Sequence, residues 1–352
     1  MTRFRPYAVP LLIAAVSCTT SETMTSPEMR DPIAREARVT GTVNYAATDL
    51  GTLPGDERSN AWAVNNAGSV AVSSSDYPST GGIVNRWYIQ TGAARTFLPN
   101  ALINALSSGS TTDVVGWDVQ GEKWAYSVSS GFSAPTALPG YPRAVNDLGH
   151  VAGETSGGAS IIMPDGSVIT QANPDPAMYS STEARDINNS DDIVIIYQDN
   201  YVTTPDRGYL RLADGTMIEF APLAGHVSTY ARGVSERIDG KVYVAGISDD
   251  DNGNYNAVRW TVDVATHAIV GTEVGGASSY STAMSDDGMI VGAIYGSTAT
   301  PFVWKRGGAI TALKAPKGLS DAAPRGVSGN GRYIAGDGQK GQYRRAILWT
   351  AQ

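Results

Sequence analysis

Four arginines occupy the same place in a phrase that recurs along the chain, two residues before an apolar residue that Asn or Ser follows. They are Arg143, Arg185, Arg232 and Arg325. Two residues earlier still, three copies carry a tyrosine: Tyr141, Tyr230 and Tyr280. A guanidinium binds a carboxylate or phosphate through two parallel hydrogen bonds, and a tyrosine ring stacks on a sugar. Brought together, these residues predict a binding site for an anionic ligand.

Ion pairing within the protein is the alternative role for these arginines. Acidic residues that are available to them include Glu183, Glu236 and Asp321. A repeat protein multiplies a structural contact as readily as a functional one, so recurrence alone does not decide. The other three copies carry Trp62, Ala101 and Thr282 at the arginine position. The sequence therefore leaves a structural and a ligand-binding interpretation open.

Metal and cofactor chemistry has little support. The three histidines fall at unrelated positions of different copies: His150, His226 and His267. A three-histidine metal site and a cofactor are therefore not expected. The run 249–254 alternates oxygen ligands as a calcium loop does, with Asp249 and Asp251 as candidate ligands. It lacks the downstream bidentate glutamate, which favours a solvated hairpin loop instead.

Acidic pairs offer a second kind of chemistry. Two carboxylates that face each other across a channel mouth can hydrolyse a glycosidic bond. Many aspartates of this chain fall in turns, where they are expected for conformational reasons. A polysaccharide-active hydrolase or lyase is thus the alternative function, without a pair of residues assigned to it.

The phrase that carries these residues recurs seven times. It is plainest at 144–153, Ala-Val-Asn-Asp-Leu-Gly-His-Val-Ala-Gly. The apolar anchors of the copies are Val64, Ile103, Val145, Ile187, Val234, Met284 and Val327, at steps of 39 to 50 residues. A period in that range is typical of a radial or solenoid array, in which each unit needs its neighbours.

Each unit predicts four short strands. In the copy at 142–170 the strands are expected at 143–146, 150–155, 159–163 and 167–170, joined by turns rich in Asn, Asp and Gly. Six copies place an aromatic residue near the end of the third strand: Trp87, Trp124, Tyr209, Trp260, Trp304 and Trp349. Such rings suit packing between adjacent sheets. Seven four-stranded units at this spacing predict an all-β fold, a seven-bladed β-propeller.

The two ends of the repeat array complement each other. The last copy ends at 348–352, after its third strand, and a spare strand at 47–55 precedes the first anchor. We expect the N-terminal strand to complete the last blade, because this pairing removes two open sheet edges.

The run 48–55, Thr-Asp-Leu-Gly-Thr-Leu-Pro-Gly, followed by Ala-Val-Asn-Asn-Ala-Gly-Ser-Val at 63–70, resembles the HAF repeat of bacterial extracellular proteins. Pro-Phe-Val-Trp at 301–304 matches the third element of that pattern. The resemblance spans about residues 45 to 352. It implies secretion and a repeat scaffold, and no catalytic motif comes with it.

The N-terminus has the features of an export signal. Arg3 and Arg5 precede a short apolar stretch, and the sequence then runs Ala-Val-Ser-Cys to Cys18, the single cysteine. This run resembles a lipobox, although Ala15 replaces the usual leucine; an ordinary secretory signal is the alternative. We therefore predict a lipoprotein-type signal peptide at 1–17, lipidation of Cys18, a flexible tether at 18–40 and the propeller at 41–352. The expected location is the outer membrane or cell surface, or otherwise the periplasm or medium.

Composition narrows the partners. The net charge of −8 and the pI of about 4.9 argue against general nucleic-acid binding, which needs a basic surface. We expect a monomer that contacts a membrane through its lipid anchor alone. The predicted function is a non-catalytic binding scaffold for a glycan or protein ligand on the loop-bearing face.

Overall fold

The computed structural model describes residues 44–76, 84–98, 101–109, 113–118, 122–127, 136–199, 205–250 and 252–352. The predicted signal peptide, Cys18 and the predicted tether lie outside the described residues. Within the described part of the chain, 28 strands form seven antiparallel four-stranded sheets, and no helix is long and apolar enough to cross a membrane.

The first four sheets follow one another along the chain. Blade 1 contains β2 (Arg58–Val64), β3 (Ser69–Asp76), β4 (Val84–Thr91) and β5 (Ala94–Leu98). Blade 2 contains β6 (Ala101–Leu106), β7 (Asp113–Asp118), β8 (Lys123–Ser127) and β9 (Thr136–Ala137). Blade 3 contains β10 (Tyr141–Val145), β11 (Val151–Thr155), β12 (Gly158–Ile162) and β13 (Val168–Gln171). Blade 4 contains β14 (Ser181–Ile187), β15 (Ile193–Gln198), β16 (Arg207–Arg211) and β17 (Met217–Glu219).

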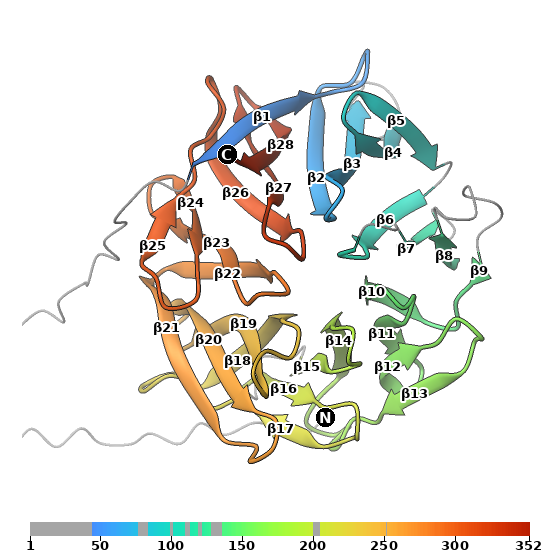
Figure 1. Ribbon diagram of the computed structural model, residues 1–352, viewed down its shortest axis with the longest axis vertical. Coiled ribbons are helices and arrows are strands. Elements are labelled where there is room, and N and C mark those ends of the chain that lie inside the picture. The colour runs from blue at the N-terminus through green and yellow to red at the C-terminus, as the bar shows by residue number, and fades with distance from the viewer. Residues whose placement is uncertain are drawn as a thin grey trace, which may run out of the picture. The chain divides into compact units, whose positions relative to one another are not determined.

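The remaining sheets complete a seven-bladed propeller (Figure 1). Blade 5 contains β18 (Ser228–Val234), β19 (Lys241–Asp249), β20 (Tyr255–Asp263) and β21 (Ile269–Ala277). Blade 6 contains β22 (Ser279–Met284), β23 (Ile290–Tyr295), β24 (Ala299–Trp304) and β25 (Ile310–Ala312). Blade 7 contains β26 (Ser320–Val327), β27 (Tyr333–Lys340), β28 (Tyr343–Ala351) and, as its outer strand, β1 (Tyr45–Gly51).

The predicted ring closure is confirmed. Strand β1 pairs antiparallel with β28, from Tyr45 opposite Ala351 to Gly51 opposite Ala346. The strand begins slightly earlier than the sequence predicted, but it comes from the expected segment. Every sheet of the propeller therefore has four strands, although the last repeat supplies only three.

The repeated Asn or Ser after each anchor folds the turn between the first two strands. Asn146 is buried, and its Oδ1 accepts the backbone N–H groups of Leu148 (3.1 Å) and His150 (2.9 Å). Its Nδ2 donates to the backbone oxygen of Asn188 in the next blade at 3.0 Å. One side chain thus closes its own turn and joins two blades, which explains the recurrence of the phrase.

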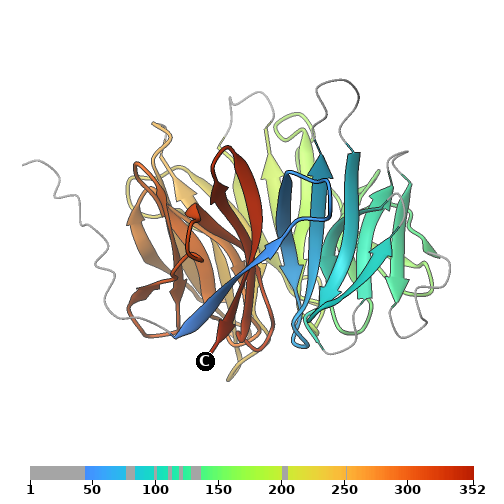
Figure 2. The same cartoon turned by 90° about the horizontal axis from the view of Figure 1, so that it is seen from above.

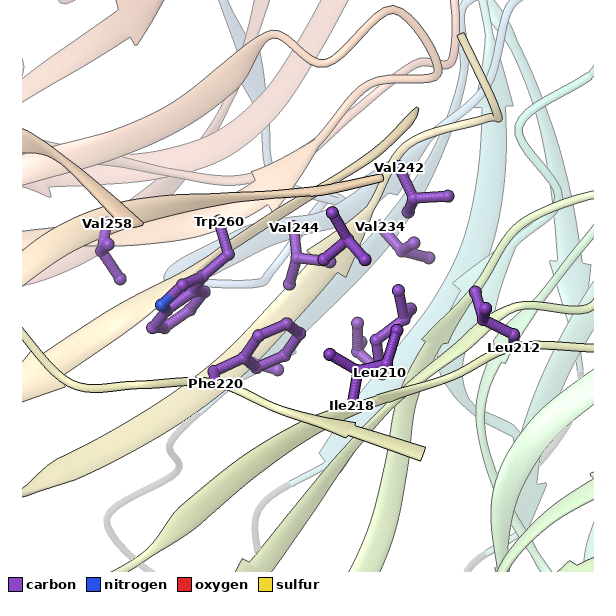
Figure 3. Close-up of a cluster of buried hydrophobic side chains, with 12 residues drawn as sticks. Leu210, Leu212, Ile218, Phe220, Val234, Val242, Val244, Val258 and Trp260 are labelled. Carbon is purple, nitrogen blue, oxygen red and sulfur yellow. The ribbon is translucent and has the colours of Figure 1, made fainter. Parts of the chain in front are cut away.

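The core lies between the blades. The interface of blades 4 and 5 shows the arrangement: Phe220 and Trp260 stack with ring centroids 4.6 Å apart, and Val244 and Leu210 pack nearby (Figure 3). The aromatic residues predicted in third strands are found in β4, β8, β16, β20, β24 and β28. Face-to-face burial of this kind gives each blade its main stabilisation.

The first strands β2, β6, β10, β14, β18, β22 and β26 lie next to one another around the axis. All of them run in the same direction between the two faces of the ring (Figure 2). We call the end of the channel at which these strands begin the upper mouth, and the end at which they finish the lower mouth.

Candidate functional site

Every first strand carries a β-bulge at the same place. A bulge sets two residues opposite one, and so redirects the extra side chain. The bulge residues, in blade order, are Trp62, Asn104, Arg143, Arg185, Arg232, Thr282 and Arg325. All seven line one cavity of about 210 Å³ enclosed by the first strands. The recurring arginine position is therefore a position inside the channel.

The predicted alignment of the second copy is wrong by three residues. The bulge of β6 falls between Ile103 and Ala105, so the anchor is Leu106, and Asn104 takes the place assigned to Ala101. Ser107 then holds the turn, because its Oγ accepts the backbone N–H of Asp113 at 3.0 Å. The sequence misled because Ile103-Asn104 imitates the apolar-Asn pair of the other copies.

Three of the arginines lie in consecutive blades, and two of them share one carboxylate. Glu183 Oε2 is 3.1 Å from Arg143 Nη2 and 2.9 Å from Arg185 Nη2. Arg232 donates instead to the hydroxyl of Tyr280, and its guanidinium carbon lies 5.0 Å from that ring's centroid. We call Arg143, Arg185 and Arg232 the arginine arc. Glu183 and Tyr280 lie nearer the start of their strands, so the arc is directed toward the upper mouth.

The arginine arc is short of acceptors. Among the described residues, the buried Nε–H groups of Arg143, Arg185 and Arg232 find no hydrogen-bond acceptor. Burial lowers the pKa of Arg185; Glu183 opposes this shift, and the charges of the other two arginines add to it. The pKa of Glu154 also reflects these charges. Burial and Glu183 raise it above its usual value, and Arg143 and Arg185 oppose that shift. Positive charge is thus concentrated where water is partly excluded.

The fourth arginine is fully paired. Arg325 Nε and Nη2 donate to the two carboxylate oxygens of Asp337, at 2.6 and 3.3 Å, and Arg344 Nε binds the same carboxylate at 2.6 Å. Its guanidinium also lies 4.5 Å from a ring centroid of Trp62. Asp321, a partner considered from the sequence, binds Arg344 instead. Arg325 therefore serves the structure of blade 7 and its contact with blade 1.

Of the three predicted tyrosines, the structure brings Tyr280 to the arc. Tyr141 is 45 % exposed, with the ammonium of Lys123 4.3 Å from its ring centroid and Trp117 edge-on to it at 6.1 Å. Burial raises the pKa of Tyr230, and the hydrogen bond to Asp206 adds to the shift. Tyr141 and Tyr230 do not line the channel cavity.

The lower mouth is organised differently. The turns after the anchors form a closed circle of hydrogen bonds, one between each pair of adjacent blades, which we call the turn ring. Each bond is donated by a backbone N–H group, and the distances are 2.5 to 3.1 Å. In blade order the bonds run from Asn66 to Ser108 O, from Gly109 to Asp147 Oδ1, from Asp147 to Asn189 Oδ1, from Asn189 to Glu236 Oε1, from Glu236 to Asp286 O, from Asp286 to Gly329 O and from Asn330 to Asn66 Oδ1. The Glu236 carboxylate, considered as an arginine partner, is therefore a link in this ring.

Carboxylates near the turn ring are hard to ionise. Burial raises the pKa of Asp186 to about 7, against the lowering effect of hydrogen bonds from the backbone N–H groups of Val234 and Ile187. Burial, Glu236 and Asp147 raise the pKa of Asp286 to about 7. Asp186 was not predicted as a site residue, although it is a carboxylate at a position that is Ala or Gly in the other copies.

The candidate calcium loop is built around Asp250, which was not one of the two candidate ligands. Asp250 Oδ1 accepts the backbone N–H groups of Asn252 (2.8 Å) and Asn254 (2.9 Å), and hydrogen bonds from the Asn254 side chain and backbone lower its pKa to about 2. Asp249 ends β19 opposite Tyr255, and Asp251 lies outside the described residues. Among the described residues, no three His, Cys, Asp or Glu side chains are placed to share a metal ion.

Comparisons with known proteins support the fold. The β-propeller domain of the Trilobed protease from Pyrococcus furiosus, which has an open velcro topology, matches with a TM-score of 0.55 at 13 % identity, over 84 % of this chain and 95 % of that one. An oligogalacturonate lyase in complex with manganese matches with a TM-score of 0.51 at 10 % identity, over 89 % of this chain and 97 % of that one. At such identities the likeness is one of fold alone. No protein-family model and no curated protein matches the chain.

Proposed function

We propose that this propeller is a non-catalytic binding scaffold whose upper mouth holds an anionic ligand on the arginine arc. The observation that carries the proposal is that three guanidinium groups in adjacent blades have one carboxylate among them, Glu183, which contacts Arg143 and Arg185, and all three keep buried Nε–H donors without acceptors among the described residues. Buried donors of this kind are costly unless a partner satisfies them. A carboxylate or sulfate group entering from the upper mouth would supply acceptors for them.

A carboxylated or sulfated glycan fits these surroundings best. The ring of Tyr280 lies beside Arg232, and the cavity of about 210 Å³ extends from the arc toward the turn ring, a volume that suits one charged group rather than a whole sugar chain. The alternative hydrolase has less support, because Glu183 is engaged by two arginines. Glu236 and Asp147 accept backbone hydrogen bonds in the turn ring. These acids already have structural partners.

A thermal-shift experiment tests the proposal. The purified protein is heated with oligogalacturonates, sulfated oligosaccharides, neutral maltooligosaccharides or calcium. A ligand that binds the folded state raises the melting temperature by mass action. We expect the anionic sugars to raise it and the Arg143→Ala/Arg232→Ala double variant to lose the rise.

Arg332→Ala is the matched control, because it removes an exposed arginine outside the channel cavity. It should keep the response of the unchanged protein. Flat curves with every anion would refute the anionic glycan and direct the search to a protein partner. A response that survives in the double variant would place binding elsewhere on the molecule.

We also propose that the chain is a HAF-repeat protein, exported and anchored through Cys18. The supporting observations are the phrase at 48–70 and the run Ala-Val-Ser-Cys at 15–18. Expression of Cys18→Ser should move the protein from the membrane fraction to the soluble fraction. An unchanged distribution would exclude the lipid anchor and leave ordinary secretion.

A further inference from the structure

The interface between blades 2 and 3 differs from the others. Each of the other six interfaces buries an aromatic ring in its core: Tyr88 for blades 7 and 1, Trp124 for 1 and 2, Tyr197 for 3 and 4, Trp260 for 4 and 5, Phe302 for 5 and 6, and Trp349 for 6 and 7. Among the described residues, the buried core between blades 2 and 3 is aliphatic: Val115, Val145, Val151 and Ile162.

A cavity of about 290 Å³ lies at this interface. Its walls include Ala125 and Leu138 of blade 2 and Val145, Val151 and Ile162 of blade 3. It reaches the lower face of the propeller beside the turn that carries Leu148, an apolar side chain that is 55 % exposed. Apolar cavities of roughly half that volume already bind a benzene ring.

The pairing of the strands shows where a tryptophan stands in three of the blades. In blade 5 the anchor Val234 pairs with Val244, which pairs with Trp260. The same two steps lead to Trp304 in blade 6 and to Trp349 in blade 7. In blades 1 and 4 they lead to Gln90 and Arg211, and the interfaces there bury a tyrosine from another position. In blade 3 they lead from Val145 to Ile162. A residue smaller than an indole therefore stands at this position, and its side chain borders the cavity.

The protein itself shows how an indole is held at such a place. Trp260 Nε1 donates to the backbone oxygen of Ala221 at 3.0 Å, and Trp349 Nε1 donates to that of Lys314 at 2.7 Å. Each acceptor lies two residues beyond the fourth strand of the preceding blade, after β17 and β25. The equivalent residue after β9 is Pro139, which lines the cavity.

Blade 3 also keeps the glycine opposite the β-bulge, which the close backbone of the first strand requires: a Cβ atom at Gly153 would lie 2.1 Å from the backbone oxygen of Tyr141, and one at Gly246 would lie 2.2 Å from that of Tyr230. In blades 5 and 7 the indole lies against this same glycine. A Cβ atom at Gly246 would lie 2.4 Å from the ring of Trp260, and one at Gly336 would lie 2.9 Å from that of Trp349. Both glycines pair with the residue before the bulge of their first strand. Gly153 occupies the same place in blade 3, opposite Pro142.

From these features we propose that the interface of blades 2 and 3 is a binding site for an indole-type ligand, a planar aromatic group that donates one N–H to the Pro139 carbonyl. The ligand replaces, from outside, the ring that the sequence omits at Ile162. The site lies on the lower face, away from the arginine arc, and does not depend on the function proposed for that arc.

Indole itself is the probe for this site. We expect it to raise the melting temperature of the unchanged protein in a saturable manner. Ile162→Trp should place the protein's own ring in the cavity and weaken indole binding at least tenfold. Ile169→Trp is the matched control, because it adds the same ring at a 41 % exposed position of β13, and it should bind indole as the unchanged protein does.

A second variant keeps the test decisive if Ile162→Trp does not fold. Ala125→Leu narrows the cavity from blade 2 and should weaken indole binding several-fold. The proposal would be overturned if indole did not shift the melting temperature of the unchanged protein. It would also be overturned if the shifts in Ile162→Trp and Ala125→Leu were as large as in the unchanged protein. Binding of 1-methylindole as tight as that of indole would overturn the role of the N–H donor.

One further probe distinguishes a free indole compound from a tryptophan side chain of a partner protein. N-acetyltryptophanamide carries the ring on a peptide backbone. If it binds as indole does, the site accepts a tryptophan side chain of a partner protein. If indole binds and the blocked tryptophan does not, the ligand is a free molecule.

Discussion

The two mouths of the channel are built from the same repeat, yet they satisfy their polar groups in opposite ways. At the lower mouth the turn ring gives every blade a hydrogen bond to the next. At the upper mouth Arg143 and Arg185 share Glu183, Arg232 binds the Tyr280 hydroxyl, and the buried Nε–H groups of all three lack acceptors among the described residues. A polar group that is fully paired stabilises the fold, whereas one that lacks a partner is available to a ligand. The comparison separates repeated residues that hold the propeller from those that can serve binding.

The largest effect on stability should come from a substitution that removes hydrogen bonds at the lower mouth. Asn188 is buried; its Oδ1 accepts the backbone N–H groups of Ser190 (3.0 Å) and Asp192 (2.9 Å), and its Nδ2 donates to Ser235 O at 2.9 Å. Asn188→Ala leaves these groups unpaired and should lower the free energy of unfolding by about 3 kcal/mol. Chemical denaturation measures it. An unchanged midpoint would mean that the turn holds without this side chain.

A pH titration gives the next largest effect. The pKa of Asp186 is about 7 in the folded protein and about 4 in an unfolded chain, so the folded state retains a proton that the unfolded state has lost. Its contribution to stability is complete below pH 4 and disappears as the pH rises through 7. Stability should therefore increase by about 2–3 kcal/mol from pH 8 to pH 5.

Asp186→Asn tests this assignment. The amide oxygen can still accept from Val234, but the side chain no longer titrates. The pH dependence of the melting temperature should become flatter, and Asp286→Asn should flatten it further. An identical slope in the unchanged protein and in Asp186→Asn would show that another group is responsible.

At the upper mouth, Glu183→Gln tests whether the arginines are available to an anionic ligand. It removes the carboxylate that competes with an anionic ligand for Arg143 and Arg185. Affinity for the anionic sugars should rise by about three- to tenfold, with a steeper dependence on salt. Calorimetric titration measures both. Glu219→Gln, which unpairs Arg207 at the outer edge of blade 4, is the control and should leave the affinity unchanged.

The smallest effect is expected for Arg185→Ala. The guanidinium is a quarter exposed, and its Nε–H has no acceptor among the described residues. Removing it should change the free energy of unfolding by less than about 1 kcal/mol. A loss as large as that of Asn188→Ala would mean that the arginine arc is structural, and would contradict the contrast between the two mouths.

Much of the fold was predictable from the sequence, because each repeated residue has one local task. Asn146 closes a turn, Gly246 makes room for a ring, and the phrase at 47–55 supplies the missing strand. The second copy was misplaced because Ile103-Asn104 imitates the apolar-Asn pair, three residues before the pair Leu106-Ser107 that folds the turn. The arginine position and Glu183 as a possible partner could be named from the sequence, but Asp337 could not, since the choice among acidic residues depends on contacts across the sheets.

The seam between β1 and β28 has a consequence for how the molecule is made. It pairs Tyr45 with Ala351, residues separated by about 300 positions in the chain. Contacts over such separations form slowly, because the chain loses much conformational freedom before they give any stabilisation. The first strand to be synthesised therefore waits for the last one. We expect ring closure to be the late step of folding, delayed until β28 has been synthesised.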